Sequence, residues 1–110
     1  MAYDEDLANR IREALADEKF VEQRMFGGLA FLIGGHTSVA VSHAGGLLSR
    51  VADDEYETAS HEPHVGDFVM RGRAMRGWLR VGVAGVESDA DLARWVERGV
   101  RVARSLPPKG

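Results

Sequence analysis

The sequence predicts an α+β fold, in which helices near the N-terminal and C-terminal ends pack on one antiparallel β-sheet. Apolar residues recur at helical spacing near both ends of the chain. Between them, short apolar or alternating runs separated by glycine are typical of an antiparallel meander followed by a hairpin. These runs are gathered together rather than alternating one by one with helices, which favours an antiparallel sheet. A length of 110 residues predicts one domain over residues 1–110.

The two terminal helices are predicted from capping residues and apolar stripes. Asp4 suits the N-cap of the first helix, and Ser88 suits the N-cap of the last one. Pro107–Pro108 prevents the last helix from continuing. The stripe expected on the first helix comprises Leu7, Ala8, Ile11, Ala14 and Leu15. The stripe expected on the last helix comprises Leu92, Trp95, Val96, Gly99, Val102, Ala103 and Leu106.

Four strands of the predicted meander lie between these helices, over residues 21–25, 29–33, 37–41 and 47–51. The pair Gly34–Gly35 lies between two of them, where a two-residue turn requires the positive φ that glycine adopts readily. Neither this pair nor Gly27–Gly28 is followed by the Lys of a Walker-type phosphate loop, and the chain contains no G-x-G-x-x-G. The glycines therefore indicate turns and not a phosphate site.

The second half of the chain is predicted to contain a short helix and a hairpin. Residues 53–60 are expected to form an acidic helix, and Pro63 breaks the loop that follows. Two further strands are expected within residues 67–83, joined around Gly72 to Gly77. Alternation on the second of these strands predicts one face with Leu79, Val81 and Val83 and the other with Trp78 and Arg80.

The composition excludes several classes of chemistry. The chain has no cysteine, so it has no disulfide, no thiolate metal site and no cysteine nucleophile. Its acidic N-terminus is unlike a signal peptide, and the longest strongly apolar run, Leu29–Ile33, is too short to span a bilayer. We therefore expect a cytoplasmic protein that makes no membrane contact.

The histidines, serines and carboxylates form no catalytic or metal-binding pattern. His36 and His43 are an odd number of residues apart, which predicts opposite faces of a regular strand. His61 and His64 flank a proline and would need two more ligands to hold zinc. There is no G-x-S-x-G motif, and the acidic clusters at 4–6 and 53–57 are interpreted as solvated helix faces. We expect no catalytic residue, metal or cofactor.

Arginines are the most informative polar feature, because the segment between Phe68 and Val86 contains four of them and no acid. Arg71 and Arg73 have the same parity along a strand, and Arg24 lies three residues before the glycine pair Gly27–Gly28. The candidate surface for an acidic partner, phosphate groups or nucleic acid comprises Arg24, Phe26, Arg71, Arg73, Arg76, Trp78 and Arg80. In the alternative, these arginines pair with carboxylates such as those at 53–57, and both tryptophans belong to the core or cover the sheet.

Three segments, in this order, resemble the TfoX N-terminal domain family: RMFGGLAFLIGG (24–35), MRGRAMRGW (70–78) and DLARWVERGVRVARSLPPKG (91–110). The resemblance covers about residues 15–109. It implies an α+β domain of the kind found in the competence regulators TfoX and Sxy, which act in bacterial transcription programmes for DNA uptake. The full regulators carry a second, helical C-terminal domain, and this chain looks like the stand-alone kind without it.

Three hypotheses on function follow. The first is a non-enzymatic regulatory or adaptor domain that contacts a protein partner such as the transcription machinery. The second is a nucleic-acid or anionic-ligand binder that uses the segment Arg71–Arg80, although a net charge of −3 argues against direct nucleic-acid binding. The third is a small enzyme, for which the sequence supplies no motif. We also expect self-association into a homodimer, since exposed strand edges invite pairing.

Overall fold

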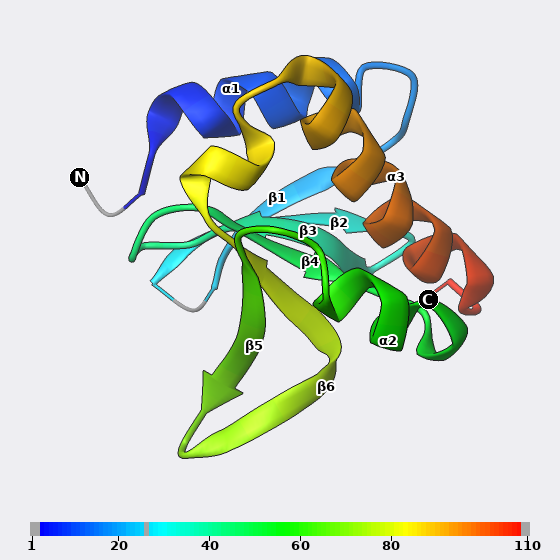
Figure 1. Cartoon of the computed structure of the whole chain (residues 1–110). Coiled ribbons are helices and arrows are strands. Elements are labelled where there is room, and N and C mark those ends of the chain that lie inside the picture. Colours follow the sequence, from blue (N-terminus) through cyan, green and yellow to red (C-terminus); the bar gives the residue numbers. More distant parts are fainter. Residues whose placement is uncertain (1–2, 26, 109–110) are drawn as a thin grey trace.

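A six-stranded antiparallel sheet in the order β1-β2-β3-β4-β6-β5 is the centre of the structure, a computed structural model that describes residues 3–25 and 27–108 (Figure 1). Strands β1 to β4 form the predicted meander, and β5 and β6 form the predicted hairpin. In chain order the elements are α1 Glu5–Ala14, β1 Val21–Met25, β2 Gly28–Ile33, β3 His36–Val41, β4 Leu47–Arg50, α2 Asp53–Ser60, β5 Val65–Met70, β6 Arg73–Val81, the 3-10 helix η1 Val83–Val86 and α3 Asp89–Ser105. This arrangement confirms the predicted α+β class.

Both terminal helices begin where the sequence predicts. The carboxylate of Asp4 accepts a hydrogen bond from the backbone N–H of Leu7 at 3.1 Å, and the Ser88 hydroxyl accepts one from the N–H of Asp91 at 3.1 Å. These side chains satisfy N–H groups that have no partner within the helix. Helices α1 and α3 lie on one face of the sheet (Figure 1).

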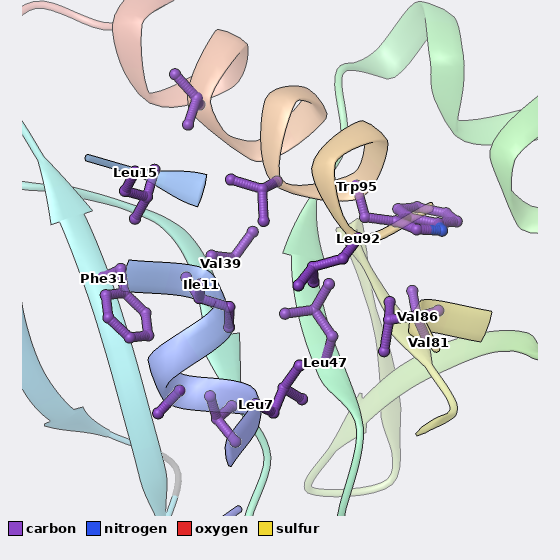
Figure 2. Close-up of a cluster of buried hydrophobic side chains, with 14 of the residues drawn as sticks. Leu7, Ile11, Leu15, Phe31, Val39, Leu47, Val81, Val86, Leu92 and Trp95 are labelled. Carbon is purple, nitrogen blue, oxygen red and sulfur yellow. The ribbon is translucent and has the colours of Figure 1, made fainter. Parts of the chain in front are cut away.

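The main core lies between these helices and the sheet. Figure 2 shows Ile11 of α1 and Leu92 of α3 in one buried cluster with the strand residues Phe31, Val39 and Leu47. Trp95 is 1% exposed, which confirms its predicted place in the core. The apolar stripes are corrected in detail: Ala14 is exposed, Val102 and Leu106 are only half-buried, and Val100 is buried in their place. Val100 follows Val96 by one helical turn, so the stripe continues through it.

The turn between β2 and β3 is the one that the sequence predicts. Gly34 and Gly35 have φ of 61° and 84°, and Ile33 pairs with His36 across the turn. Positive φ at both central residues matches the right-handed twist of the two strands. Gly34–Gly35 therefore forms the turn that connects β2 and β3.

The hairpin of β5 and β6 differs from the prediction at its turn. The chain reverses at Arg71–Gly72, and β6 continues through Gly77. The prediction that the two strands are joined around Gly72 to Gly77 was therefore wrong. Val83 belongs to η1 and is 55% exposed, so it does not continue the face formed by Leu79 and Val81. The turn was misplaced because glycine is compatible with both a turn and a bulged strand, and the sequence pattern alone does not distinguish the two.

Candidate functional site

The outer part of the β5–β6 hairpin, residues Val69–Arg76, projects from the sheet and is called the hairpin arm here. Figure 1 shows it directed away from α1 and α3. Asp67 pairs with Leu79 whereas Val69 pairs with Ala74, so β6 carries extra residues at this point. Such a bulge bends a strand pair. Gly77 lies in this bulge with φ of 92°, and its carbonyl accepts the N–H of Val51 at 2.9 Å, which fixes the base of the hairpin arm to the end of β4.

The side chains of the hairpin arm combine apolar groups with free cations. Every residue from Arg71 to Arg76 is exposed, and Val69 and Met75 are 55% and 37% exposed. Neither Arg71 nor Arg73 has a carboxylate within 4.0 Å in the part of the chain that the structure describes. Arg71 lies in the turn with φ of 53° and Arg73 begins β6, so the two do not share a strand parity as expected. The hairpin arm thus presents unpaired positive charge beside exposed apolar surface.

Arg76 is held at the base of the hairpin arm by an aromatic contact. Its guanidinium lies 5.1 Å from the centre of the Tyr56 ring of α2, and the Tyr56 hydroxyl donates a hydrogen bond to Asp67 Oδ1 at 3.1 Å. Burial raises the pKa of Tyr56, and the bond to Asp67 raises it further. The contact links α2 to both strands of the hairpin, because Asp67 is on β5 and Arg76 on β6.

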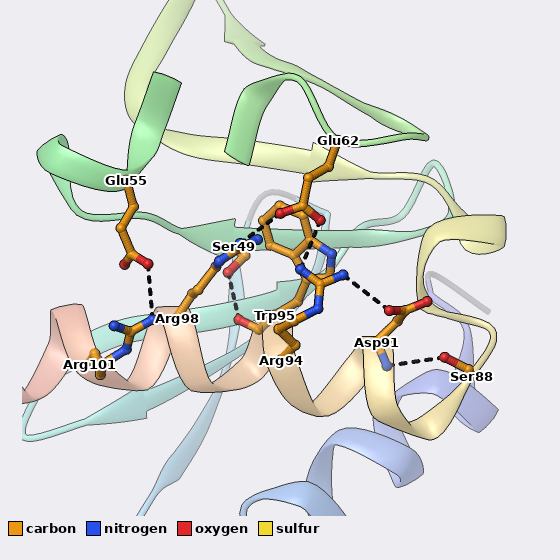
Figure 3. Close-up of polar contacts among 9 residues, drawn as sticks. All are labelled: Ser49, Glu55, Glu62, Ser88, Asp91, Arg94, Trp95, Arg98 and Arg101. Carbon is orange, nitrogen blue, oxygen red and sulfur yellow. Dashed lines mark hydrogen bonds and ion pairs between the residues drawn. The ribbon is translucent and has the colours of Figure 1, made fainter. Parts of the chain in front are cut away.

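Arginines of α3 form ion pairs with carboxylates that could otherwise have neutralised the hairpin arm. Figure 3 shows Glu62 accepting hydrogen bonds from Arg94 at 2.8 Å and facing Arg98 at 2.6 Å. Glu55 of α2 pairs with Arg101 of α3 at 3.1 Å. Burial raises the pKa of Glu62, but the hydrogen bonds from the two arginines lower it below its ordinary value. Of residues 53–57, Glu55 is therefore paired with an arginine of α3 and not with one of the hairpin arm.

The side of the sheet that faces away from the helices, called the helix-free face here, carries a second apolar cluster. Its members are all strand residues, with Ala30, Ala40 and Leu48 buried and Met25, Leu32, Phe68 and Trp78 packed against them. Arg50 and Arg80 lie on this face, because Arg50 pairs with Trp78 and Arg80 pairs with Leu48. Trp78 therefore covers the sheet, which is one of the two positions expected for it.

Arg50 is a functional candidate that the sequence analysis missed. Its guanidinium lies 5.3 Å from the centre of the Trp78 ring, and its Nε is buried without a hydrogen-bond partner. Burial lowers the pKa of Arg50. The alternation of Leu47 and Ser49 with Leu48 and Arg50 was the available signal, since it places the last two on one face.

The remaining candidates lie apart from the hairpin arm. Arg24 is on β1, at the opposite edge of the sheet, and pairs with Leu29, whose side chain is in the core beneath the helices. It therefore points to the helix-covered side of the sheet. Phe26 lies outside the described residues. The structure thus separates Arg24 from the hairpin arm and places Arg80 on the helix-free face.

The histidines and buried serines have structural contacts. His36 Nε2 lies 2.7 Å from the carbonyl oxygen of Pro107, and His43 follows the end of β3, so the two do not share a strand as expected. The hydroxyls of Ser38 and Ser49 donate to the carbonyls of Phe31 and Trp95. Within residues 3–25 and 27–108, no group of three or more His, Asp or Glu is placed to hold a metal ion. None of the described helices is both long and apolar enough to cross a bilayer.

The sheet with helices on one face and a projecting hairpin defines a small α+β domain. The family model described as the TfoX N-terminal domain matches residues 6–103, and the chain belongs to this family. No curated protein and no solved structure matches the chain. The family match confirms the resemblance seen in the three sequence segments.

Proposed function

We propose that the protein is a non-enzymatic regulatory or adaptor domain of the competence-regulator type, which acts in the cytoplasm by contacting a partner protein. The observation that carries the proposal is the hairpin arm, where Arg71 and Arg73, which have no carboxylate partner among the described residues, lie beside exposed Val69 and Met75. Interfaces are enriched in arginine and methionine, and their few strongly contributing residues are apolar or aromatic anchors and arginines. Membership in the TfoX N-terminal domain family supports a regulatory role.

The charge of the hairpin arm favours a partner with an acidic surface. The arginines of α3 are paired with carboxylates of this chain, as Arg101 is with Glu55 and Arg94 with Glu62, so α3 offers an acidic partner little net attraction. Arg71 and Arg73 of the hairpin arm have no such partner in the described residues, and the β5–β6 hairpin that carries them is directed away from α1 and α3 (Figure 1). Complementary charge of this kind steers a partner toward one surface and raises the rate of association.

An affinity-capture comparison tests this proposal. The wild-type chain, the variant Arg71→Gln/Arg73→Gln and the matched control Arg101→Gln/Arg104→Gln are used with and without nuclease, and the retained proteins are identified by mass spectrometry. We expect a nuclease-resistant partner, such as a component of the transcription machinery, that the wild type and the control retain and the hairpin-arm variant loses. Equal loss with the control variant would show that only net charge matters, and no specific partner under either condition contradicts the proposal.

A second candidate function is binding of a nucleic acid or another anionic ligand by the segment Arg71–Arg80. The observation that favours it is the same set of unpaired arginines, because phosphate groups attract them as carboxylates do. Nuclease-sensitive retention, together with affinity that falls steeply with salt concentration, would favour this candidate.

Self-association is a separate prediction about the same domain. β1 and β5 are the outermost strands of the sheet, and outermost strands offer unpaired backbone groups to a second strand. Light scattering over a range of protein concentrations measures whether a dimer forms.

A further inference from the structure

We propose that the helix-free face binds an acidic, extended segment of the partner protein, with Arg50 and Arg80 donating hydrogen bonds to its carboxylates. This inference rests on the proposed function and names the chemistry of the partner. It adds a second surface to the hairpin arm, on the side of the sheet opposite α1 and α3.

The register of β4 and β6 places the two cations in one patch. Arg50 lies across from Trp78, and Arg80 lies across from Leu48, so the two arginines occupy diagonal positions of the same face. Diagonal neighbours on a sheet face are about 7–8 Å apart. Alternate side chains of an extended peptide are about 7 Å apart on one side of the chain. Two carboxylates with one residue between them therefore match the spacing of these two positions on the sheet.

Arg50 is the stronger anchor, because the fold has removed part of its water without supplying a counter-ion. Its Nε is buried with no hydrogen-bond partner, and no carboxylate among the described residues lies within 4.0 Å of it. Its guanidinium stacks over Trp78 at 5.3 Å, which orients the planar N–H groups. A partly dehydrated arginine with free N–H groups forms strong, often bidentate hydrogen bonds with a carboxylate.

Among the described strand residues, the helix-free face carries no acidic side chain. The register places no Asp or Glu of β1, β2, β3, β4, β5 or β6 on this face. Glu22 of β1 is paired with Phe31 on the helix side and binds Arg12 there, and Asp67 of β5 binds Tyr56. A protein with 17 acidic residues thus keeps one sheet face free of them.

Access to Arg80 comes across the edge strand β5. Its partner on β5 is Gly66, where an added Cβ would meet no heavy atom within 4 Å. A cavity of about 290 Å³ is lined here by Gly66, Arg80, His64 and Asp67, among others, and the carboxylate of Asp67 accepts a hydrogen bond from Tyr56. The missing side chain at Gly66 leaves room for a ligand group to approach the Arg80 guanidinium from the edge of the sheet.

An acidic peptide fits this face better than a nucleic acid does. Leu32, Phe68 and Trp78 are half-buried on the same face, with Trp78 in contact with Arg50, and suit apolar residues that alternate with the acidic ones. Phosphate backbones need several cations in a row, whereas a net charge of −3 repels a long polyanion. Charge complementarity and the apolar side chains on this face together favour an acidic peptide over a nucleic acid.

Binding of a defined peptide to the full chain tests the inference. The probe is a short synthetic peptide in which glutamate alternates with valine, and the reference probe has glutamine in place of glutamate. We expect the Nε–H signals of Arg50 and Arg80 in the NMR spectrum to shift and saturate with the glutamate peptide only. Arg50→Gln should weaken binding roughly tenfold to a hundredfold, as expected for a lost charge-assisted hydrogen bond, and Arg101→Gln should leave it unchanged.

A second variant, which keeps every charge, tests the inference even if Arg50→Gln fails to fold. Gly66→Leu fills the space beside Arg80 without meeting a neighbouring atom at its Cβ, so we expect it to fold and to weaken peptide binding. An unshifted Arg50 signal at saturating peptide would overturn the inference. So would equal weakening by Arg101→Gln, tighter binding of inorganic phosphate or a single-stranded oligonucleotide, or a dimer that Arg50→Gln abolishes. These outcomes do not depend on the capture experiment, because that experiment measures the loss of partner binding through the hairpin arm. The two proposals can therefore fail separately.

Discussion

The close approach of α3 to β3 predicts a large effect of replacing Gly99 by alanine. A Cβ at Gly99 would lie 2.2 Å from the carbonyl oxygen of Ser38 and 2.9 Å from Cγ1 of Val39. Even weak carbon–oxygen contacts are about 3.3–3.6 Å long, so the helix must move by about 1 Å. A backbone oxygen within a sheet cannot turn aside as a flexible side chain can.

The expected magnitude is the difference between two opposing terms. Alanine is favoured over glycine in a helix interior by about 1 kcal/mol. Added atoms in a well-packed core typically cost about 1–3 kcal/mol, occasionally more, and here the clash is with backbone. The displacement also loosens Trp95 and Val96, which are 1% and 2% exposed. We therefore expect Gly99→Ala to lower the free energy of unfolding by about 2 kcal/mol, or about 10 °C in Tm for a domain of this size.

Urea denaturation followed by circular dichroism measures this effect. Gly66→Ala is the matched control, because its Cβ meets nothing within 4 Å, and we expect it to leave stability unchanged or to raise it by up to about 1 kcal/mol. If Gly99→Ala were as stable as the wild type, the tight contact between α3 and β3 would be refuted.

Three further predictions concern the base of the hairpin arm, a buried hydroxyl and an acid-sensitive contact. Gly77→Ala should cost about 1–2 kcal/mol in urea denaturation, because φ of 92° strains any residue with a Cβ. Ser49→Ala should cost about 1 kcal/mol by the same assay, because it removes the 3.0 Å hydrogen bond to the Trp95 carbonyl. Hydrogen bonds from two arginines of α3 outweigh the effect of burial and lower the pKa of Glu62, so its contribution to stability is present above the unfolded-state pKa and is lost as pH falls through the lower folded-state value. Glu62→Gln should therefore flatten the decline of stability with acid, measured as Tm against pH.

The positions of the helices and strands could be predicted from the sequence because local chemistry determines them. Ser88 caps a backbone N–H whatever the rest of the chain does, and Gly34–Gly35 can adopt a turn with positive φ that few other pairs tolerate. The short acidic helix Asp53–Ser60 was predicted with the bounds that the structure gives it. Each of these signals lies within a few residues of the element that it defines.

The candidate site was less predictable, because it depends on pairing between distant segments. β6 lies beside β4, and only this pairing places Arg50 across from Trp78 and Arg80 across from Leu48. The interval from Gly72 to Gly77 contains a turn at one end and a bulge at the other, and the glycine pattern alone is the same for both. The ion pair of Glu55 with Arg101, rather than with an arginine of the hairpin arm, likewise joins residues that are 46 positions apart in the chain.

The distribution of paired and unpaired arginines supports reading the hairpin arm and the helix-free face as contact surfaces. With 17 acidic and 14 basic residues, the chain has enough carboxylates to pair every arginine. Exposed ion pairs stabilise a fold by only about 0–1 kcal/mol each, so stability alone gives little reason to place charges one way or the other. Pairing nevertheless neutralises the side with Arg94 and Arg101, while Arg50 and Arg73 stay without carboxylate partners in the described residues. Arginines without a carboxylate partner, gathered on the hairpin arm and the helix-free face, attract an acidic partner toward these surfaces.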